Sequence, residues 1–283
     1  MMIKRKLIGV DIGGTKIKAG LIIDNQIVEK YEIKTPSDKS KEEVLKSIAD
    51  CIHHVYTPEV EGIGIGVPGM VDIKNGIVKY VNNIPTWKEV KLKEYLEKIF
   101  NIPVLVNNDA NCFVAGEKYF GKAQALNNIV GITLGTGLGG GIIINNHLHN
   151  GLGTGAGEVG YLPYKDSIFE HYCSSQFFHT FHQTTGVEIY ERIKAGDKQA
   201  QEIMDEFGHH LGELIKVITY LLAPESIVFG GSISQSFHLF EKSMWNTINT
   251  FPFKTSINGL EVYATELNDM AVLGAAALYL NSL

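Results

Sequence analysis

Two alternating patterns of apolar residues run along the chain. Short apolar runs that end in glycine, asparagine or proline are typical of buried strands, whereas apolar residues that recur every three or four positions are typical of helices. Strands are predicted at residues 6–10, 17–23, 27–34, 62–67, 104–106 and 261–264, and at the start of 226–232. Helices are predicted at residues 40–55, 90–100, 110–117, 167–181, 187–193, 198–222, 237–248 and 270–280. The alternation of the two patterns predicts an α/β fold.

One arrangement of these patterns occurs twice. Residues 8–25 and residues 128–146 each combine an apolar strand, a glycine-rich turn, a second strand and an Asx hairpin. Glycines of the two copies, such as Gly20 and Gly141, correspond if a one-residue gap is allowed. Any two glycine-rich hairpins look alike, but agreement over the whole stretch favours two domains of similar topology. Both glycine turns would then line a cleft between the domains.

Length and composition narrow the class of protein. A chain of 283 residues is long enough for two domains, and 45% hydrophobic and 20% charged residues are typical of a soluble globular protein. The net charge of -6, without a basic segment, argues against nucleic acid as a partner. Three widely spaced cysteines suit a reducing compartment, and no apolar stretch has the length of a signal peptide or membrane span. We therefore expect a cytoplasmic protein with no membrane partner.

A polar interruption at residues 107–109 separates a predicted strand from a predicted helix. Asp109 would stand at the carboxyl end of the strand, which is where open α/β sheets bind ligands. Amides at the helix N-terminus would keep its carboxylate ionised and fixed in direction, while lowering its basicity. The commoner use of such residues is the N-cap, so either Asn108 or Asp109 could serve only to cap the helix. The alternative is that Asp109 accepts a proton from a substrate hydroxyl.

Both glycine turns have the composition of a phosphate-binding loop. Backbone amides that no side chain shields can point into one concavity, and the hydroxyls of Thr15 and Thr136 would be further donors. Either Lys16 or Lys18 could add positive charge. Asp11 would repel phosphate unless a cation lay between them, which suggests Mg²⁺. Each turn taken alone is more often an ordinary hairpin.

Taken together, these features describe phosphoryl transfer to an alcohol. That reaction needs an aligned hydroxyl, a group that accepts its proton, and neutralisation of the charge on the γ-phosphate. Four polar residues in apolar or glycine-rich surroundings would suit a polyhydroxylated acceptor, although a turn or cap role is the commoner use of each. They are Asn83, Asn108, Glu158 and Glu170.

Four motifs in this order resemble the ROK family of repressors, open reading frames and sugar kinases, in the actin-like ATPase superfamily. They are Asp11-Ile-Gly-Gly-Thr-Lys, Val106-Asn-Asn-Asp-Ala-Asn, Leu134-Gly-Thr-Gly-Leu-Gly-Gly-Gly and Gly157-Glu-Val-Gly. The resemblance implies an α/β fold of two actin-like (ribonuclease H-like) domains of similar topology with an interdomain cleft. The domains are expected at residues 1–110 and 111–267, with residues 268–283 packing back on the first. It also implies ATP and Mg²⁺ as cofactors, a hexose substrate and a homodimer.

The resemblance also implies roles for particular residues. Asp109 matches the family's catalytic base, Asn108 its neighbouring sugar ligand, and Asn83 the asparagine of its sugar loop. Residues that match the nucleotide-binding segments are Asp11, Gly13, Gly14, Thr15, Lys16, Gly135, Thr136, Gly137, Gly230 and Gly231. Asp11 is also the expected partner of the Mg²⁺ that accompanies ATP. Glu158 and Glu170 complete the expected sugar site.

The chain departs from the family pattern where a zinc loop is usual. Tyr161 replaces a histidine and the cysteine-rich loop is missing, so zinc is not expected. Glu170 still aligns with the sugar-binding glutamate that follows the zinc cysteines, and packing by Tyr161, Tyr164 and Tyr172 is expected in place of the metal. The alternative is a new metal site, although its spacing matches no standard zinc motif. That site would consist of His171, Cys173, His179 and His182.

The expected function is therefore glucokinase-like phosphorylation of a hexose by ATP, with the 6-hydroxyl as acceptor. Fructose, mannose and an N-acetylhexosamine are alternative substrates. A sugar-sensing protein without catalysis is the alternative from another class, since the family also contains repressors. Those carry an N-terminal DNA-binding domain, and here the first glycine turn already begins at Asp11. An actin-like ATPase is a third possibility, which the four polar residues that would suit a sugar argue against.

Overall fold

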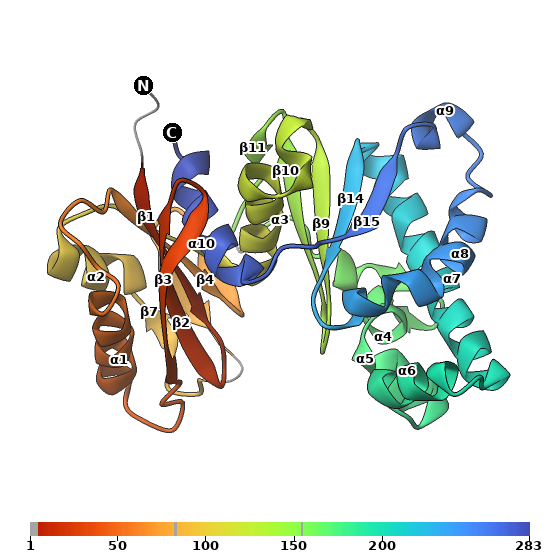
Figure 1. The fold of residues 1–283 in the computed structure, drawn as a ribbon, viewed down its shortest axis with the longest axis horizontal. Coiled ribbons are helices and arrows are strands. Elements are labelled where there is room, and N and C mark those ends of the chain that lie inside the picture. Colours follow the sequence, from red (N-terminus) through yellow and green to blue (C-terminus); the bar gives the residue numbers. More distant parts are fainter. Residues whose placement is uncertain (1–4, 82–83, 154) are drawn as a thin grey trace. The chain divides into compact units, whose positions relative to one another are not determined.

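The computed structural model describes residues 5–81, 84–153 and 155–283. The chain forms two compact units (Figure 1). Unit 1 contains residues 1–125, 141–156 and 267–283, and unit 2 contains residues 126–140 and 157–266. The first division lies after Ala125 rather than at the expected residue 110, because the helix that follows Asp109 packs within unit 1.

The centre of unit 1 is a five-stranded sheet of order β3-β2-β1-β4-β8. Its strands are β1 (Lys6–Ile12), β2 (Lys16–Ile23), β3 (Gln26–Lys34), β4 (Gly62–Val67) and β8 (Val104–Asn108). The first three are antiparallel, as predicted from the two hairpin turns, whereas β1, β4 and β8 run parallel. The parallel strands therefore place their carboxyl ends at one edge of the sheet.

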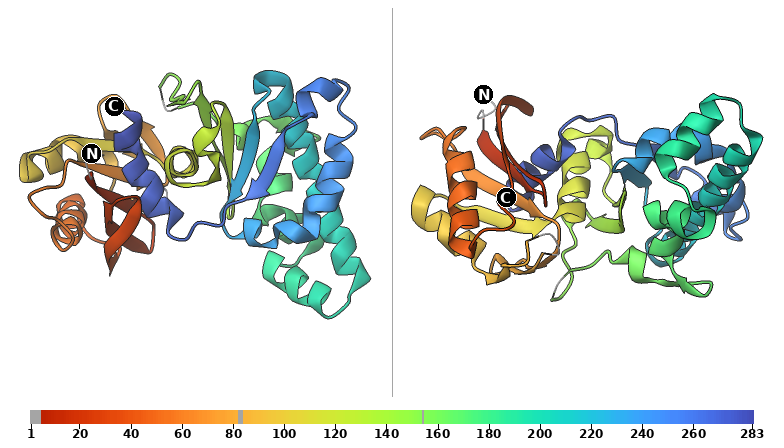
Figure 2. Two further views of the ribbon diagram at one scale, coloured as in Figure 1. Left: turned by 45° about the horizontal axis from the view of Figure 1, so that its top comes forward. Right: turned by 90° about the horizontal axis from the view of Figure 1, so that it is seen from below.

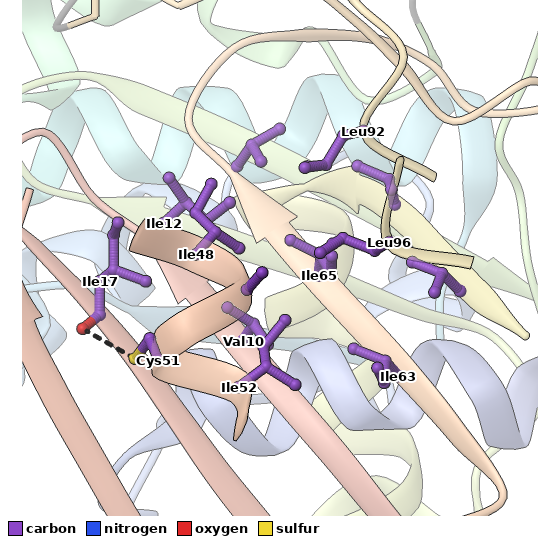
Figure 3. Close-up of a cluster of buried hydrophobic side chains, with 14 of the residues drawn as sticks. Val10, Ile12, Ile17, Ile48, Cys51, Ile52, Ile63, Ile65, Leu92 and Leu96 are labelled. Atoms are coloured by element: carbon purple, nitrogen blue, oxygen red, sulfur yellow. Dashed lines mark hydrogen bonds between the residues drawn. The ribbon is translucent and has the colours of Figure 1, made fainter. Parts of the chain in front are cut away.

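Two predicted helices cover one face of this sheet. They are α1 (Lys41–His53) and α2 (Leu92–Phe100). Ser40 and Glu43 form a capping box that begins α1. Ile48 and Ile52 of α1 pack with strand residues such as Val10 in one buried cluster, which Figure 3 shows. Burial of this apolar cluster holds the two helices on the sheet.

The opposite face receives α10 (Met270–Asn281), which lies beside β1 and β4 (Figure 2). A side chain at Gly9 or Gly64 would collide with backbone carbonyl oxygens of α10. The glycines of these strands therefore allow the backbone of α10 to approach closely. On its other side α10 crosses α3 (Asp109–Phe120), where Gly116 and Gly274 leave no room for side chains.

Unit 1 also contains short strands that the apolar pattern did not predict. They are β5 (Met70–Asp72), β6 (Ile77–Tyr80) and β7 (Lys88–Val90), which form a separate three-stranded sheet. Each has three or four residues, which is too short to show a period. The 3-10 helix η1 (Lys122–Ala125) follows α3, and a hairpin joins β10 (Leu138–Ile144) to β11 (His147–Leu148).

Unit 2 is built on the parallel strands β9 (Ile129–Leu134), β14 (Ser226–Gly230) and β15 (Glu261–Ala264). The sheet that contains them has the order β11-β10-β9-β14-β15, which follows the same scheme as the first sheet. This agreement confirms the duplication predicted from the two glycine hairpins. β2 has eight residues and its counterpart β10 has seven, which places the one-residue gap within this strand.

The helices of unit 2 enclose a core rich in aromatic residues, including Phe177, Phe207 and Phe240. Its helical elements are η2 (Val159–Tyr161), α4 (Phe169–Cys173), α5 (Ser175–His182), α6 (Gly186–Lys194), α7 (Lys198–Leu222), η3 (Ile233–Ser236), α8 (Phe237–Ile248) and α9 (Lys254–Ile257). The strands β12 (Pro163–Tyr164) and β13 (Ser167–Ile168) form a small hairpin. Among the described residues no helix has the length and apolarity to cross a membrane.

One predicted helix of unit 2 was wrong. The expected helix at residues 167–181 is interrupted at Ser174, whose backbone is extended and whose side chain accepts a hydrogen bond from the Gln176 amide as the N-cap of α5. A serine can cap a new helix where its neighbours would continue the old one, and the apolar period does not register that break.

Candidate active site

The carboxyl edge of the unit 1 sheet brings polar residues of β1 and β8 to either side of a glycine of β4. In the ladder Asp11 of β1 lies opposite Gly66 of β4, and Gly66 lies opposite Asn107 of β8. A side chain at Gly66 would come within 3.2 Å of the Cys112 sulfur in α3. Glycine at this position therefore allows the start of α3 to lie close against the sheet edge, where Asp109 begins the helix.

The structure separates the capping role from the proposed catalytic one. Asn108 is the N-cap of α3, and its Oδ1 accepts a hydrogen bond of 2.8 Å from the Asn111 amide. Asp109 is the first helical residue, and its Oδ1 accepts a hydrogen bond of 2.9 Å from the Ala110 amide. The capping alternative therefore applies to Asn108. Asp109 is not required as the N-cap.

The electrostatic environment of Asp109 differs from the sequence-based expectation. Its side chain is accessible to solvent, yet the surrounding protein raises the pKa of the carboxyl group by desolvation. Hydrogen bonds from the Ala110 and Asp109 amides act in the opposite direction but are the smaller effect. The helix amides therefore act in the expected direction, but desolvation outweighs them and the net pKa is raised. A carboxylate with a raised pKa is a better proton acceptor.

Asp11 is a second carboxyl group with a disfavoured charge. Burial raises its pKa to about 6, the positive charge of Lys18 lowers it, and the negative charge of Asp109 raises it further. Lys18 lies directly opposite Asp11 in the β1–β2 ladder. Lys16, the lysine expected to bind the nucleotide, pairs with Glu32 at 2.6 Å. Of the two lysines considered, Lys18 is thus the one whose charge acts on Asp11.

The first glycine turn is held by contacts to its backbone. The Gly13 amide donates to the Lys16 carbonyl at 2.8 Å, and the Thr35 hydroxyl donates to the Gly13 carbonyl at 2.7 Å. The Thr35 amide also donates to the Thr15 carbonyl at 2.9 Å. These contacts shape the turn, so Gly14 and the exposed Thr15 lie on a fixed loop.

The second glycine turn lies in unit 2 and is bordered by Glu170. The Gly135 amide donates to the Gly137 carbonyl at 3.1 Å, and Glu170 Oε2 accepts from the Leu138 amide at 3.0 Å. A side chain at Gly137 would meet the same carboxylate. The Ser175 amide donates to the Gly135 carbonyl at 2.8 Å. Glu170 therefore contacts the turn that carries Thr136, and its predicted role in sugar binding stays a prediction.

A cavity of about 520 Å³ lies in unit 2. Its walls combine apolar side chains such as Phe178 and Ile233 with hydroxyls that include Ser175 and Ser232. Gly231, at the end of β14, has a φ of +87° and crosses close to the backbone of Leu134. Here glycine is required both for the turn and for the close approach. Gly230 and Gly231 thus lead the chain into the wall of the cavity.

Two further residues predicted to bind the substrate are Glu158 and Asn83. Glu158 is exposed at the start of η2. Asn83 lies outside the described residues. Their roles in sugar binding remain predictions. Asn107 and Asn111 were assigned no role from the sequence, although both belong to the motif at residues 106–111.

Aromatic packing occupies part of the region where the family pattern has a zinc loop. Tyr164 stacks on Phe169 at 4.2 Å between ring centroids and meets the edge of Tyr172 at 5.2 Å. Its hydroxyl lies 3.0 Å from Nδ1 of His210, whose pKa is lowered to about 3 by burial. The expected packing holds for Tyr164 and Tyr172 but was wrong for Tyr161, which is 67% exposed.

The alternative metal site is not formed by the proposed residues. Within residues 5–81, 84–153 and 155–283, no group of three or more histidine, cysteine, aspartate or glutamate side chains could hold a metal ion. His171 lies 2.6 Å from the Ser167 hydroxyl, and His182 lies 3.3 Å from the Glu206 carboxylate. These two histidines thus have different neighbours.

Comparison with known proteins places the chain among sugar-related proteins. The model of a family described as the ROK family matches residues 7–282. A glucokinase of Thermotoga maritima is 30% identical, over 98% of this chain and 98% of the relative. A xylose repressor of Bacillus spizizenii is 28% identical, over 96% of this chain and 76% of the repressor.

A solved structure gives the same picture. The ROK family glucokinase from Streptomyces griseus, in complex with glucose and AMPPNP, matches with a TM-score of 0.77 and 28% identity. The match covers 96% of this chain and 98% of that chain. Together with the duplicated strand order, this likeness confirms the predicted α/β fold of actin-like type.

Proposed function

We propose, from the premise that the chain belongs to the ROK family, that it is a kinase that transfers the γ-phosphoryl group of ATP to the 6-hydroxyl of a hexose. The observation that carries this proposal is Asp109. Its carboxylate stands at the carboxyl edge of the sheet, is not the helix cap, and has a raised pKa. These are the properties of a general base for an alcohol.

In this mechanism Asp109 accepts the proton of the sugar hydroxyl as the oxygen attacks phosphorus. The hydrogen bond from the Ala110 amide fixes one carboxylate oxygen, which directs the group without neutralising it. Asn108 stands next to Asp109 at the start of α3 and would orient the sugar. Precise alignment of the hydroxyl supplies much of the rate enhancement in phosphoryl transfer.

The nucleotide would bind through the glycine turns and the cavity of unit 2. Backbone amides of Gly14 and Thr15 and of Thr136 and Gly137 would hold phosphate oxygens, while those of Gly13 and Gly135 donate within their own turns. The largely apolar cavity suits the nucleoside, which agrees with the AMPPNP complex of the Streptomyces griseus glucokinase. Asp11 fits the role of a magnesium partner, because Lys18 offsets its unfavourable charge only in part. Magnesium would supply charge neutralisation on the phosphates.

Glucose is the first candidate among hexoses, because the similar proteins of known structure or name include glucokinases. Fructose, mannose and an N-acetylhexosamine remain the alternatives. A cytoplasmic homodimer is part of the proposal, and a mass of twice the chain in light scattering is the expected result.

Replacement of Asp109 by Asn tests the assignment directly. The amide keeps the size of the side chain but cannot accept the proton, so kcat should fall by at least about 10²-fold. Sugar-dependent ADP release across a panel of hexoses and amino sugars measures turnover, and calorimetric titration measures sugar binding. We expect binding within a few-fold of the unmodified protein. Turnover close to normal in Asp109→Asn would show that another group accepts the proton.

A sugar-sensing protein is the second candidate, which the match to a xylose repressor favours. Such a protein would bind sugar without turning it over. Sugar binding in the titration, together with no ADP release at any sugar and ATP concentration, would select this alternative over the kinase.

A further inference from the structure

A chain of side-chain amides lies beneath the proposed base and plays no part in the mechanism above. Asn107 and Asn111 are only 2% and 1% exposed, and the Nδ2 of Asn111 donates to the Oδ1 of Asn107 at 2.9 Å. The Nδ2 of Asn107 in turn donates to the Oδ1 of Asn150 at 2.9 Å. The three asparagines belong to β8, α3 and the loop after β11.

The direction of these hydrogen bonds is determined by the backbone. The amide of Asn108 can only donate, and it donates to the Oδ1 of Asn107 at 2.8 Å. The oxygen of Asn107 must therefore face Asn108 and Asn111, and its NH₂ group must face Asn150. Asn150 must then offer an oxygen. One buried side chain thus joins the residue that caps α3 to a loop distant in sequence.

The loop held by Asn150 is the glycine-rich segment 150–156. The Asn150 carbonyl accepts a hydrogen bond of 3.1 Å from the Ala156 amide, which closes the segment at its base. Gly151 has a φ of +67°, and a side chain there would collide with Ala156. Asn150 and Gly151 therefore lie close to Ala156, and the Oδ1 of Asn150 attaches this base of the segment to Asn107.

Buried polar groups are costly unless they are paired, so such a network needs a reason. The Oδ1 of Asn111 is buried and makes no hydrogen bond within the described part of the chain. The arrangement is thus not optimised for stability alone. What it does achieve is to fix residues 107–109 and the base of the loop relative to each other, within unit 1.

We propose that Asn150 is a positioning residue for the phosphoryl acceptor: through Asn107 it holds Asn108 and Asp109 in the alignment that the sugar hydroxyl requires. This inference rests on the proposed kinase function. It adds a residue that touches neither substrate in the mechanism above and that acts on the sugar side of the site through Asn107.

Replacement of Asn150 by Ala and by Asp separates the oxygen from the rest of the side chain. Asn150→Ala removes the acceptor, and because misalignment by about 1 Å can cost 10²-fold, we expect kcat to fall by about 10- to 100-fold. The KM for the sugar should rise, while the KM for ATP should stay within about twofold. Asn150→Asp keeps an oxygen for the Asn107 NH₂ group and should recover most of the activity.

The controls distinguish a positioning role from a structural one. Asn258→Ala, an exposed asparagine after α9 in unit 2, should leave all constants unchanged. Thermal melting of each variant reports whether the fold is kept. A lower melting temperature for Asn150→Ala, with unchanged kcat and KM at a temperature where the protein is folded, would overturn the proposal. Equal losses in Asn150→Asp and Asn150→Ala would do the same.

The same measurements distinguish failure of the positioning role from failure of the proposed kinase function. If the unmodified protein releases ADP in a sugar-dependent manner and Asn150→Ala matches it, the inference fails and the proposed function stands. If the unmodified protein turns over no sugar, the proposed function fails and the positioning role fails with it.

Discussion

At the scale of single residues, the site depends on the protonation of two carboxyl groups close to one sheet edge. Desolvation by the surrounding protein disfavours the charge on both Asp11 and Asp109. The positive charge of Lys18 on β2 opposes this effect at Asp11, and the amides of α3 oppose it at Asp109. The proposed mechanism needs both groups ionised, one to accept a proton and one to face the cation that accompanies ATP. Folding therefore opposes the negative charge that the proposed mechanism uses at both positions.

Asp11→Asn should raise the free energy of unfolding in a pH-dependent manner, because the variant has no charge to desolvate at this position. The carboxyl pKa is near 3.8 when unfolded and about 6 when folded, so the folded state binds the proton more tightly. This tighter proton binding stabilises the folded protein fully below about pH 4, and the stabilisation is lost as pH rises through 6. Asn does not ionise, so Asp11→Asn does not lose stability in this way. Its free energy of unfolding should exceed that of the unmodified protein by about 1–3 kcal/mol at pH 7.

Urea unfolding at several pH values measures the difference between Asp11→Asn and the unmodified protein. The difference should vanish at about pH 3, below the pKa of 3.8 in the unfolded chain, where Asp11 is mostly protonated in both states. A difference that is constant between pH 4 and pH 7 would contradict the pKa assigned to Asp11.

At the scale of elements, glycines determine which helix covers which strand. Gly9 and Gly64 on β1 and β4 leave a face without side chains, and α10 lies on it with its backbone close to theirs. Small residues on α10 and α3 then allow these two helices to cross closely. Because α3 begins at Asp109, the packing of α3 against α10 and the sheet also determines the position of the proposed base.

Gly64→Ala should weaken this packing. The new methyl group would collide with the Ala275 carbonyl, and a backbone atom within a helix cannot turn aside as a side chain can. We expect a loss of about 2 kcal/mol or more in the free energy of unfolding. Gly186→Ala is the matched control, because its methyl group would make only ordinary contacts with Phe178. Similar effects of the two substitutions in urea unfolding would argue against the close approach of α10.

At the scale of the whole molecule, the chain returns to its first unit at the end. Unit 1 is assembled from three segments, and the last of them contains α10. Unit 2 is completed by β15 before that segment begins. The two units should therefore respond differently to loss of the C-terminus.

Removal of residues 267–283 should destabilise unit 1 selectively. Without α10 the glycine-lined face of β1 and β4 and the buried residues of α3 lose their cover. Hydrogen exchange followed by mass spectrometry should show faster exchange in β1, β4 and α3, with protection of β14 and α7 retained. Uniform loss of protection in both units would show that they do not fold separately.

Much of this organisation could be predicted from the sequence. Periodicity predicted α7, α8 and β15 with their observed bounds, because long amphipathic or bounded apolar segments have one stable conformation. Duplication of the glycine hairpin predicted two sheets of like order. The short strands β5 to β7 and the break at Ser174 were not predicted, since strands of three or four residues show no period and a local side-chain cap leaves the apolar pattern unchanged.

The sequence by itself determined the kind of fold, the family motifs and the chemical types at the candidate site. Only the tertiary structure decided that Asn108 rather than Asp109 caps α3, that Lys18 rather than Lys16 acts on Asp11, and that burial outweighs the helix amides at Asp109. The physical reason is common to all three. Motifs record which groups are present, whereas hydrogen-bond partners and pKa values depend on distances and burial that exist only once the strands have assembled.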